Sequence, residues 1–430
     1  MVVIILYAIL LLTVGLLCVI LRKSAMAIFN TLWALVIFLC REDLCLESYS
    51  QTLLLLTIMI VMVNAGCLLG SVELTSRVRF GLLTDRRQFD SRLLTLLLSL
   101  AGLIFLFYAV RTAARFGFDL ELIRGTNNSD SEDKVFSSLL DTIAFYGVAM
   151  PVIYVGALVC AYNFSQQIRT PRHIYVLILL DMVLYVLTAG GRSMFIRVAL
   201  FFAAAVLWRM KKPGGINMKW FKYVLLAVAG LLVVMELLTA ARNSRDISFL
   251  EQAVMYIRGA VSHMRYQLER MRSDSWYFGY ITYGGFFYYP VTLVSRVLGT
   301  DWQTSNEILA FLQKFKYIRV GSESVNYNAL VPNVFYYYFD SGYLGVVLFS
   351  LFLGLAAGAG ERAHAKPGFF RFVLWATAVY AIVYSPMDSV LWPFRYPTAL
   401  IYCFVLRNLI YRPVDGGNDG TADQCHHSNL

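Results

Sequence analysis

Apolar stretches of about 20 residues recur along most of this chain and restrict its fold more than any other feature. A helix needs roughly 20 mostly apolar residues to cross the hydrocarbon core of a bilayer. The composition agrees, with 59% hydrophobic residues, 15% charged residues and a mean hydropathy of +0.62. We therefore predict an all-α, polytopic integral membrane protein with about 11 transmembrane helices. The predicted spans are 2–21, 25–40, 52–70, 93–113, 139–162, 173–189, 193–210, 221–240, 343–360, 369–386 and 390–411.

Basic residues in alternate short loops predict the orientation of these spans. Nineteen Lys and Arg residues fall in the loops that follow spans one, three, five, seven, nine and eleven, and few fall in the opposing short loops. Such loops face the cytoplasm by the positive-inside rule, so we expect the N-terminus outside and the C-terminus inside. The formal net charge of +10 then mostly reports topology, and no nucleic-acid partner is indicated.

The polar residues divide the chain into four predicted parts. Residues 1–240 hold the first eight helices, 241–342 form a large extracytoplasmic loop, 343–411 hold the last three helices, and 412–430 form a disordered tail. Ten of the 37 Lys and Arg residues lie between positions 241 and 330, beside many Tyr residues. In a chain otherwise suited to lipid, this loop is where we expect chemistry on a water-soluble group.

Within the large loop, residues 251–272 have the pattern of an amphipathic helix. Apolar residues recur on one face at helical spacing, at Val254, Ile257, Val261, Met264, Leu268 and Met271. Arg258, Arg265 and Arg272 repeat every seven residues and therefore drift only about 20° per step along one edge of that face. Such a helix lies along the membrane surface or caps a cavity, with its arginines toward headgroups or a bound anion.

Aromatic residues are concentrated just after this helix and again near position 336. Nine of the 14 residues in 276–289 are aromatic, which fits either an interfacial belt or a stacking surface for sugar rings. The glycines of this segment favour a close-packed turn over a straight span. A helix over 331–360 would be about 45 Å long, too long for one crossing of about 30 Å. We therefore predict a break at Asp340-Ser341-Gly342.

Charged residues in or near the spans require partners because an unpaired charge in the bilayer is costly. Asp181 and Arg197 lie in spans six and seven, and we predict either a structural ion pair or a pair that holds Arg192 in place. Arginine presents a planar fork that suits phosphate oxygens. The predicted outer set can face solvent and lipid headgroups or form a phosphate or pyrophosphate site, and we favour the site. The set is Arg192, Arg242, Arg245, Arg258, Arg265 and Arg272.

Several motifs that would indicate other chemistry do not occur in the sequence. It contains no Walker A sequence, no H-E-x-x-H, no D-x-D triplet and no Gly-x-Ser-x-Gly elbow. The seven cysteines include no C-x-x-C pair. We therefore expect no cofactor and no metal, with arginines stabilising the charge of a leaving group.

Three short motifs and the arrangement of the spans resemble bacterial O-antigen polymerases, the Wzy-type oligosaccharide repeat-unit polymerases. The motifs are Gly190-Gly191-Arg192-Ser193, the Arg-bearing loop, and Asn333 followed by Tyr-Tyr-Phe-Asp340-Ser-Gly342-x-x-Gly345. The Arg-x10-Gly pattern of some members is absent, since no predicted outer Arg has Gly eleven residues on. The resemblance implies a GT-C-like glycosyltransferase that joins undecaprenyl-pyrophosphate-linked repeat units in the bacterial inner membrane, with its active site facing the periplasm.

The resemblance also implies roles for particular residues and partners. A general base must deprotonate the acceptor hydroxyl, and the candidates are Asp340 and His263, with Asp246 and Glu323 behind them. The implied partners are the lipid-linked oligosaccharide, the bilayer, a chain-length regulator and a flippase. The residues expected to bind substrate are Arg192, Arg242, Arg245, Arg258, Arg265, Tyr283, Asn333 and Tyr337.

Two other functions stay open at the level of sequence. An O-antigen ligase would use the same donor but transfer it to lipid A core. A lipid-linked oligosaccharide flippase or other transporter would move the molecule without making a bond. Transporters commonly show internal repeats and charged residues throughout the core, whereas the polar content of this chain is concentrated in one loop.

Overall fold

The structure is a computed structural model that describes residues 1–72, 87–128, 136, 138–211, 218–241, 248–271, 276–327, 330–363 and 368–413. Most of these residues are helical, and the strands form only two short antiparallel pairs, so the predicted all-α character is confirmed. Arg242, Arg245, Asp246, Arg272 and the predicted tail beyond Pro413 lie outside the described residues.

A helix overlaps each of the eleven predicted spans. They are α1 (Val2–Ile20), α2 (Ser24–Leu39), α4 (Ser50–Ser71), α5 (Ser91–Phe116), α8 (Met150–Gln166), α9 (Arg172–Ala189), α10 (Ser193–Met210), α11 (Met218–Ala240), α15 (Asn333–Ala363), α16 (Phe369–Tyr384) and α17 (Arg395–Ile410). Before α8 come α7 (Leu139–Thr142) and the π-helical η3 (Ile143–Ala149). Seven helices of the described chain are long and apolar enough to cross a membrane, and many of their Leu, Ile and Val side chains are exposed. For α2, α11, α16 and α17, a full crossing stays a prediction.

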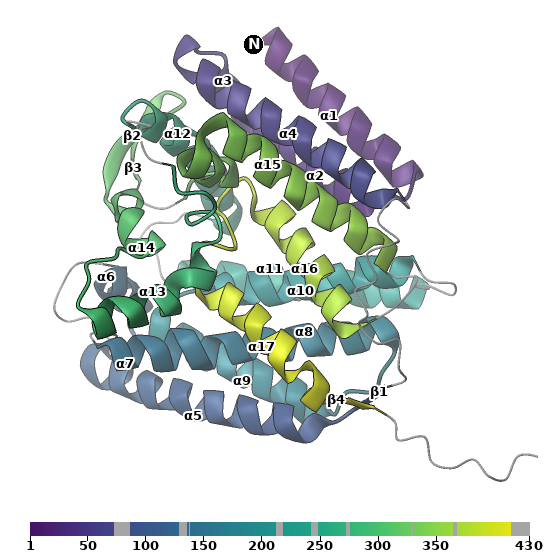
Figure 1. The fold of residues 1–430 in the computed structure, drawn as a ribbon, viewed down its shortest axis with the longest axis vertical. Coiled ribbons are helices and arrows are strands. Elements are labelled where there is room, and N and C mark those ends of the chain that lie inside the picture. The colour runs from purple at the N-terminus through teal and green to yellow at the C-terminus, as the bar shows by residue number, and fades with distance from the viewer. Residues whose placement is uncertain are drawn as a thin grey trace, which may run out of the picture.

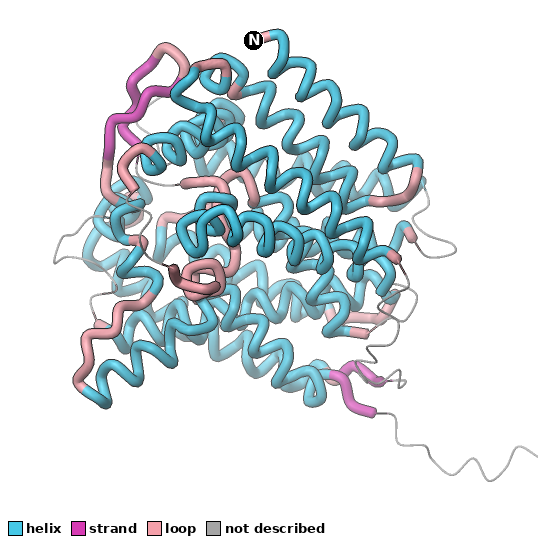
Figure 2. Tube along the Cα trace, turned by 45° about the horizontal axis from the view of Figure 1, so that its top comes forward, coloured by secondary structure: helices cyan, strands magenta, loops and turns pink. Residues whose placement is uncertain are grey.

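Short elements gather at the two ends of the helix bundle. One end, here called the loop end, carries α3 (Arg41–Leu44), η1 (Glu47–Tyr49), α6 (Leu120–Asn128), α12 (Phe249–Leu268), α13 (Gly284–Leu298), α14 (Ser305–Ile308), η4 (Ala310–Gln313), β2 (Lys316–Val320) and β3 (Glu323–Tyr327). The other end carries β1 (Arg87–Phe89) paired with β4 (Tyr411–Pro413). Figure 1 and Figure 2 show the two strand pairs on opposite sides of the bundle.

The long helices are arranged in two groups with α16 between them. In Figure 1, α1, α2, α4 and α15 lie together in the upper part, and α5, α8, α9 and α17 lie below. Large side chains fill the space between helices, and Trp33, Trp208 and Trp375 are almost fully buried. A buried indole N–H without an acceptor is costly. Trp33 donates to the Ser385 hydroxyl at 3.0 Å and Trp375 to the carbonyl of Ala204 at 3.1 Å, whereas the Trp208 N–H has no partner in the described chain.

The predicted amphipathic helix is present as α12. It begins with a capping box, in which the Ser248 side chain accepts from the Glu251 N–H and the Glu251 side chain accepts from the Ser248 N–H. Its apolar face is buried at Val261, Met264 and Leu268. Because α12 packs on α4 and β2 at the loop end, it covers that end of the bundle.

The predicted break in the last long loop segment is also present. Inside α15, Ser341 has φ −154° and ψ 30°, and Gly342 has φ +60°. A φ of +60° favours glycine, which has no Cβ to clash with the following carbonyl. The Tyr-rich first part of α15 therefore takes a different direction from the long apolar part that follows.

Candidate functional site

A cavity of about 730 Å³ extends from the loop end into the helix bundle. Its walls come from α7 and η3, α10, α13, α14, the end of α16, the 385–394 loop and the start of α17. Segments that are far apart in the sequence therefore line the same cavity. Its charged residues are Arg197, Arg296, Glu307, Asp388 and Arg395, and its aromatic residues are Tyr146, Tyr288, Tyr380, Tyr384, Trp392, Phe394 and Tyr396.

Three arginines on three helices line this cavity. Arg197 on α10 donates to the Tyr154 hydroxyl, and its Nε is buried without a hydrogen-bond partner in the described chain. The guanidinium carbon of Arg395, at the first position of α17, lies 3.9 Å from the centroid of the Tyr146 ring. Arg296 is exposed on α13. None of the three forms an ion pair with a residue that the structure describes, so they leave positive charge for an anion.

The carboxylate of Asp388 is held in the cavity wall by one of its two oxygens. Its Oδ1 accepts from the Tyr336 hydroxyl at 2.7 Å, the Trp392 indole at 2.8 Å and the Ser389 N–H at 2.8 Å. No described residue donates to Oδ2. Burial raises the pKa of Asp388, while these hydrogen bonds and the Arg197 charge oppose that effect.

The segment that carries Asp388 is a non-helical loop between α16 and α17. Pro386 and Pro393 lack the N–H that a continuing helix needs. The loop is anchored where Ser385 accepts the Asn333 N–H at 2.9 Å and Leu391 accepts the Gly285 N–H at 3.1 Å. The prediction of spans over 369–386 and 390–411 treated this segment as a short connection, although two prolines around an Asp and a Trp were a visible signal.

Aromatic rings form much of the remaining wall. Tyr288 stacks on Phe394 with ring centroids 4.1 Å apart and an interplanar angle of 11°. Trp392 stacks on Tyr336 at 5.8 Å. Exposed faces of such rings suit the apolar faces of sugars, while tyrosine hydroxyls supply hydrogen bonds. The cavity therefore combines positive charge, two hydrogen-bonded carboxylates and aromatic surfaces.

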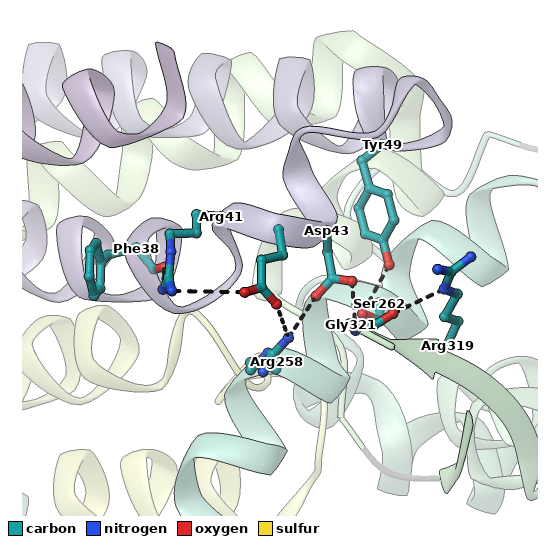
Figure 3. A network of polar contacts seen from close by, with 9 residues as sticks. Phe38, Arg41, Asp43, Tyr49, Arg258, Ser262, Arg319 and Gly321 are labelled. Atoms are coloured by element: carbon teal, nitrogen blue, oxygen red, sulfur yellow. Dashed lines mark hydrogen bonds and ion pairs between the residues drawn. The ribbon is translucent and has the colours of Figure 1, made fainter. Parts of the chain in front are cut away.

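The predicted arginines of the large loop that the structure describes lie elsewhere. Arg258 is 3.5 Å from both Glu42 Oε2 and Asp43 Oδ2, and the Asp43 Oδ1 accepts the Gly321 N–H at 2.7 Å (Figure 3). Arg265 is 3.1 Å from Glu269. The contacts of Arg258 and Asp43 join α12, α3 and the β2–β3 turn. Both guanidinium groups, those of Arg258 and Arg265, therefore already have anionic partners.

The predicted Arg192 is buried at the turn between α9 and α10. Its guanidinium donates to Thr239 on α11 and to Gln252 on α12, and it lies over the Phe249 ring at 4.9 Å. This arginine therefore connects three helices at the loop end. It does not line the arginine-rich cavity.

The two predicted general bases are deeply buried and hydrogen-bonded. Asp340 Oδ2 accepts the Gly279 N–H at 2.5 Å, and Oδ1 accepts the Ile281 N–H at 2.9 Å. His263 Nδ1 donates to the Leu330 carbonyl at 3.1 Å, so Nε2 accepts from Gln267 at 2.8 Å. Both side chains have an exposed fraction of 0%. Their proton-accepting atoms already have partners in this conformation.

The remaining predicted substrate residues lie close together but outside the cavity. Asn333 Nδ2 donates to the Tyr337 hydroxyl at 3.2 Å. Tyr283 and Tyr337 both pack against Phe349, with centroid distances of 5.6 and 5.7 Å. The role of these three residues in binding substrate stays a prediction.

The predicted Asp181–Arg197 pair is not formed. Asp181 is fully buried on α9, faces Gly102 of α5, and has no hydrogen-bond partner for either oxygen within the described ranges. Arg197 instead contacts Tyr154 of α8. The prediction was wrong because neighbouring helices in sequence turn these two positions toward different partners, which spacing alone does not determine.

Comparisons with known proteins assign no function to this site. No protein-family model, no curated protein and no solved structure matches the chain. Among the residues that the structure describes, no three His, Cys, Asp or Glu side chains are grouped as metal ligands would be.

Proposed function

We propose that this protein is a membrane glycosyltransferase that polymerises undecaprenyl-pyrophosphate-linked oligosaccharide repeat units into O-antigen or a related surface polysaccharide. The reaction would take place on the extracytoplasmic side of the bacterial inner membrane. The resemblance of the Asn333–Gly345 motif and of the arrangement of spans supports the choice of reaction. The arginine-lined cavity supports the class of substrate.

The observation that carries the proposal is the meeting of Arg197, Arg296 and Arg395 in one aromatic-walled cavity. These three arginines face two carboxylic acids, Glu307 and Asp388, which leaves the cavity positive. A lipid-linked saccharide has a diphosphate next to a sugar, and the cavity offers guanidinium forks beside ring faces. We therefore assign pyrophosphate binding to these three arginines.

The proposed chemistry needs stabilisation of a leaving group more than activation by a metal. When the bond between the anomeric carbon and the pyrophosphate oxygen breaks, negative charge grows on that oxygen. Fixed cationic donors in a partly enclosed site stabilise such charge without having to reorganise. Arg197 is held by Tyr154 and Arg395 lies over Tyr146, so both are positioned before substrate arrives.

The loop arginines take a different place in this proposal. Arg258 and Arg265 have carboxylate partners, and Arg192 connects helices, so we propose that they hold the loop end over the cavity. Their predicted contact with pyrophosphate stays a prediction, as does the contact predicted for Arg242 and Arg245.

Reconstitution of the purified chain with a defined lipid-pyrophosphate repeat unit tests the proposal. We expect a ladder of products that persists when a chelator is present. Arg395→Ala and Arg296→Ala should each lower the turnover number by about 10²–10³, the usual cost of removing one such donor. Arg319→Ala is the matched control, because Arg319 is exposed on β2 and does not line the cavity.

Other outcomes would reject the polymerase. Transfer of the donor only when lipid A core is added would indicate a ligase. Movement of the lipid-linked saccharide across vesicles without any new glycosidic bond would indicate a flippase. Equal turnover by the Arg395→Ala, Arg296→Ala and Arg319→Ala variants would remove the cavity from the reaction.

A further inference from the structure

We propose that Asp388 is the general base that deprotonates the acceptor hydroxyl. This inference rests on the proposed glycosyl transfer and names a catalytic residue for it. Asp388 was not among the residues that the sequence pointed to, and its assignment comes from the contacts of its two oxygens.

The two oxygens of the Asp388 carboxylate have different surroundings. Oδ1 accepts three hydrogen bonds, from Tyr336, Trp392 and Ser389, which fix the plane of the carboxylate. Oδ2 accepts none from the described chain and is not among the buried atoms without a partner. Because Asp388 lines the cavity, Oδ2 is the oxygen left for a ligand.

Other carboxyl and imidazole groups near the loop end lack this combination. Both oxygens of Asp340 accept backbone N–H groups, and both ring nitrogens of His263 have partners. Glu307 lies in the cavity wall, but it is exposed and its Oε2 caps α14 through Thr304. Glu307 is likewise held through one oxygen, but Asp388 is only partly exposed and its restrained oxygen accepts three hydrogen bonds, so its orientation toward the cavity is better fixed.

The proposed step balances in atoms and electrons. The acceptor hydroxyl oxygen forms a bond to the anomeric carbon of the donor saccharide, and its proton moves to Asp388 Oδ2. The bond from the anomeric carbon to the pyrophosphate oxygen breaks, and the lipid pyrophosphate leaves with the electron pair. The negative charge on the leaving pyrophosphate is stabilised by Arg197, Arg296 and Arg395. The proton then passes from Asp388 to water before the next turnover.

The groups around Asp388 determine the pH dependence. Burial raises the pKa of this carboxyl, and the donors Trp392, Tyr336 and Ser389 and the Arg197 guanidinium lower it. Tyr384 of α16 and Tyr327 of β3 also interact electrostatically with it, and Glu307, Arg296 and Arg395 complete the charged lining. Only the ionised carboxylate accepts a proton. The rate should therefore fall as pH drops through a pKa above the usual aspartate value of about 3.9.

Asp388→Asn is a sharp test because its carboxamide oxygen can still accept the three fixed donors. Only the proton-accepting Oδ2 is replaced, so the fold and the binding of lipid-linked donor should persist. We expect polymer formation to fall about 10²–10⁴-fold, the range of general base catalysis, at an unchanged KM. The control is Asp301→Asn, since Asp301 is exposed and does not line the cavity.

A second variant, Tyr336→Phe, distinguishes a role of Tyr336 in positioning Asp388 from a loss of activity caused by a disturbed fold. Tyr336→Phe removes one donor from Oδ1, and loss of a hydrogen bond to the charged form raises a carboxyl pKa. We therefore expect the acidic limb of the rate profile to shift to higher pH, while the plateau at high pH is retained. A purely structural role for Tyr336 would lower the rate equally at every pH.

The outcomes distinguish this inference from the proposed function. A ladder from the wild-type protein and an equal ladder from Asp388→Asn, with the same acidic limb, would overturn the base and leave the polymerase standing. If the wild-type protein made no glycosidic bond from the defined repeat unit, both would fall. A folded Asp388→Asn variant that binds donor but forms no polymer is the supporting result.

Discussion

His263 and Asp340 are fully buried, and their proton-accepting atoms already have hydrogen-bond partners. Both are residue types that accept protons in active sites, and both occur in the polar segment where chemistry was expected. In the fold, His263 connects α12 to the carbonyl of Leu330, and Asp340 fixes the backbone of the aromatic turn at Gly279 and Ile281. At the residue scale, we therefore expect both side chains to contribute to the stability of the folded protein.

We predict that acidification destabilises the protein through His263. Burial lowers the pKa of His263 to about 4, whereas an unfolded histidine has a pKa of about 6.5. Between these values the unfolded chain binds a proton that the folded chain does not, so stability is lost as pH falls from 6.5 toward 4. The full loss is about 3 kcal/mol by proton linkage. Thermal unfolding in detergent should show a steeper fall of Tm for the wild type than for His263→Gln, and parallel curves would contradict it.

A second prediction concerns Asp340→Asn. The amide group of Asn cannot accept from both the Gly279 and the Ile281 N–H groups, so one buried donor loses its partner. That loss costs about 1–3 kcal/mol, which lowers the Tm of the purified protein. The sequence-based role as a base makes a different prediction, namely an unchanged Tm with no polymer. Measuring Tm and product length on the same sample separates the two.

At the scale of elements, the closest helix packing is between α4 and α15. A Cβ added at Gly354 would come within 3 Å of the Cys67 N–H and closer still to the Val63 carbonyl, and Gly66 faces the backbone of α15 in the same way. Small residues let helix backbones approach inside a membrane, where no hydrophobic force holds them together. The first part of α15 in turn reaches the cavity wall, where the Tyr336 hydroxyl donates to Asp388.

We predict that Gly354→Ala destabilises the α4–α15 pair. The added methyl group meets backbone atoms that cannot rotate away, and overpacking of this kind costs about 1–3 kcal/mol. The matched control is Gly230→Ala on α11, where a Cβ meets nothing within 4 Å. The unfolding midpoint of purified protein in a denaturant series measures the difference, and equal midpoints for the two variants would refute the prediction.

At the scale of the whole molecule, the two ends of the bundle differ in character. The loop end carries the cavity entrance, α12 and the β2–β3 pair, and the other end carries the short β1–β4 pair with an Arg412–Asp90 ion pair at 3.0 Å. Among the described residues of the predicted basic loops, Arg22 between α1 and α2 and Arg412 of β4 lie toward this second end. From this placement, the positive-inside rule predicts that the cavity opens away from the cytoplasm.

Cys45 offers a direct test of orientation. It follows α3 at the loop end and is exposed, whereas the other described cysteines are buried. We expect a membrane-impermeant maleimide to label Cys45 in intact spheroplasts of a Cys425→Ser background. Cys45→Ser should lose the signal. With Arg169→Cys added to that variant, labelling should appear only after the membrane is permeabilised, because Arg169 is exposed near the other end. The reverse pattern would place the cavity in the cytosol.

Local patterns predicted much of the fold. The positions of helices followed from apolar length, α12 from its 3.6-residue period, and the kink from the length of 331–360 with Gly342 at its centre. Each of these signals lies within one segment. The candidate site was predicted less well, because Arg197, Arg296, Asp388 and Arg395 come from four separate segments.

The sequence by itself determined that the chain is helical and apolar, roughly where its long helices lie along the chain, and that arginine and tyrosine dominate the polar parts. Those properties depend on residue type and spacing along one segment. Only the tertiary structure decided which arginines have carboxylate partners and which line a cavity, and which carboxylate keeps an oxygen free. Such choices depend on helix rotation and on contacts between residues far apart in the chain, which no local pattern encodes.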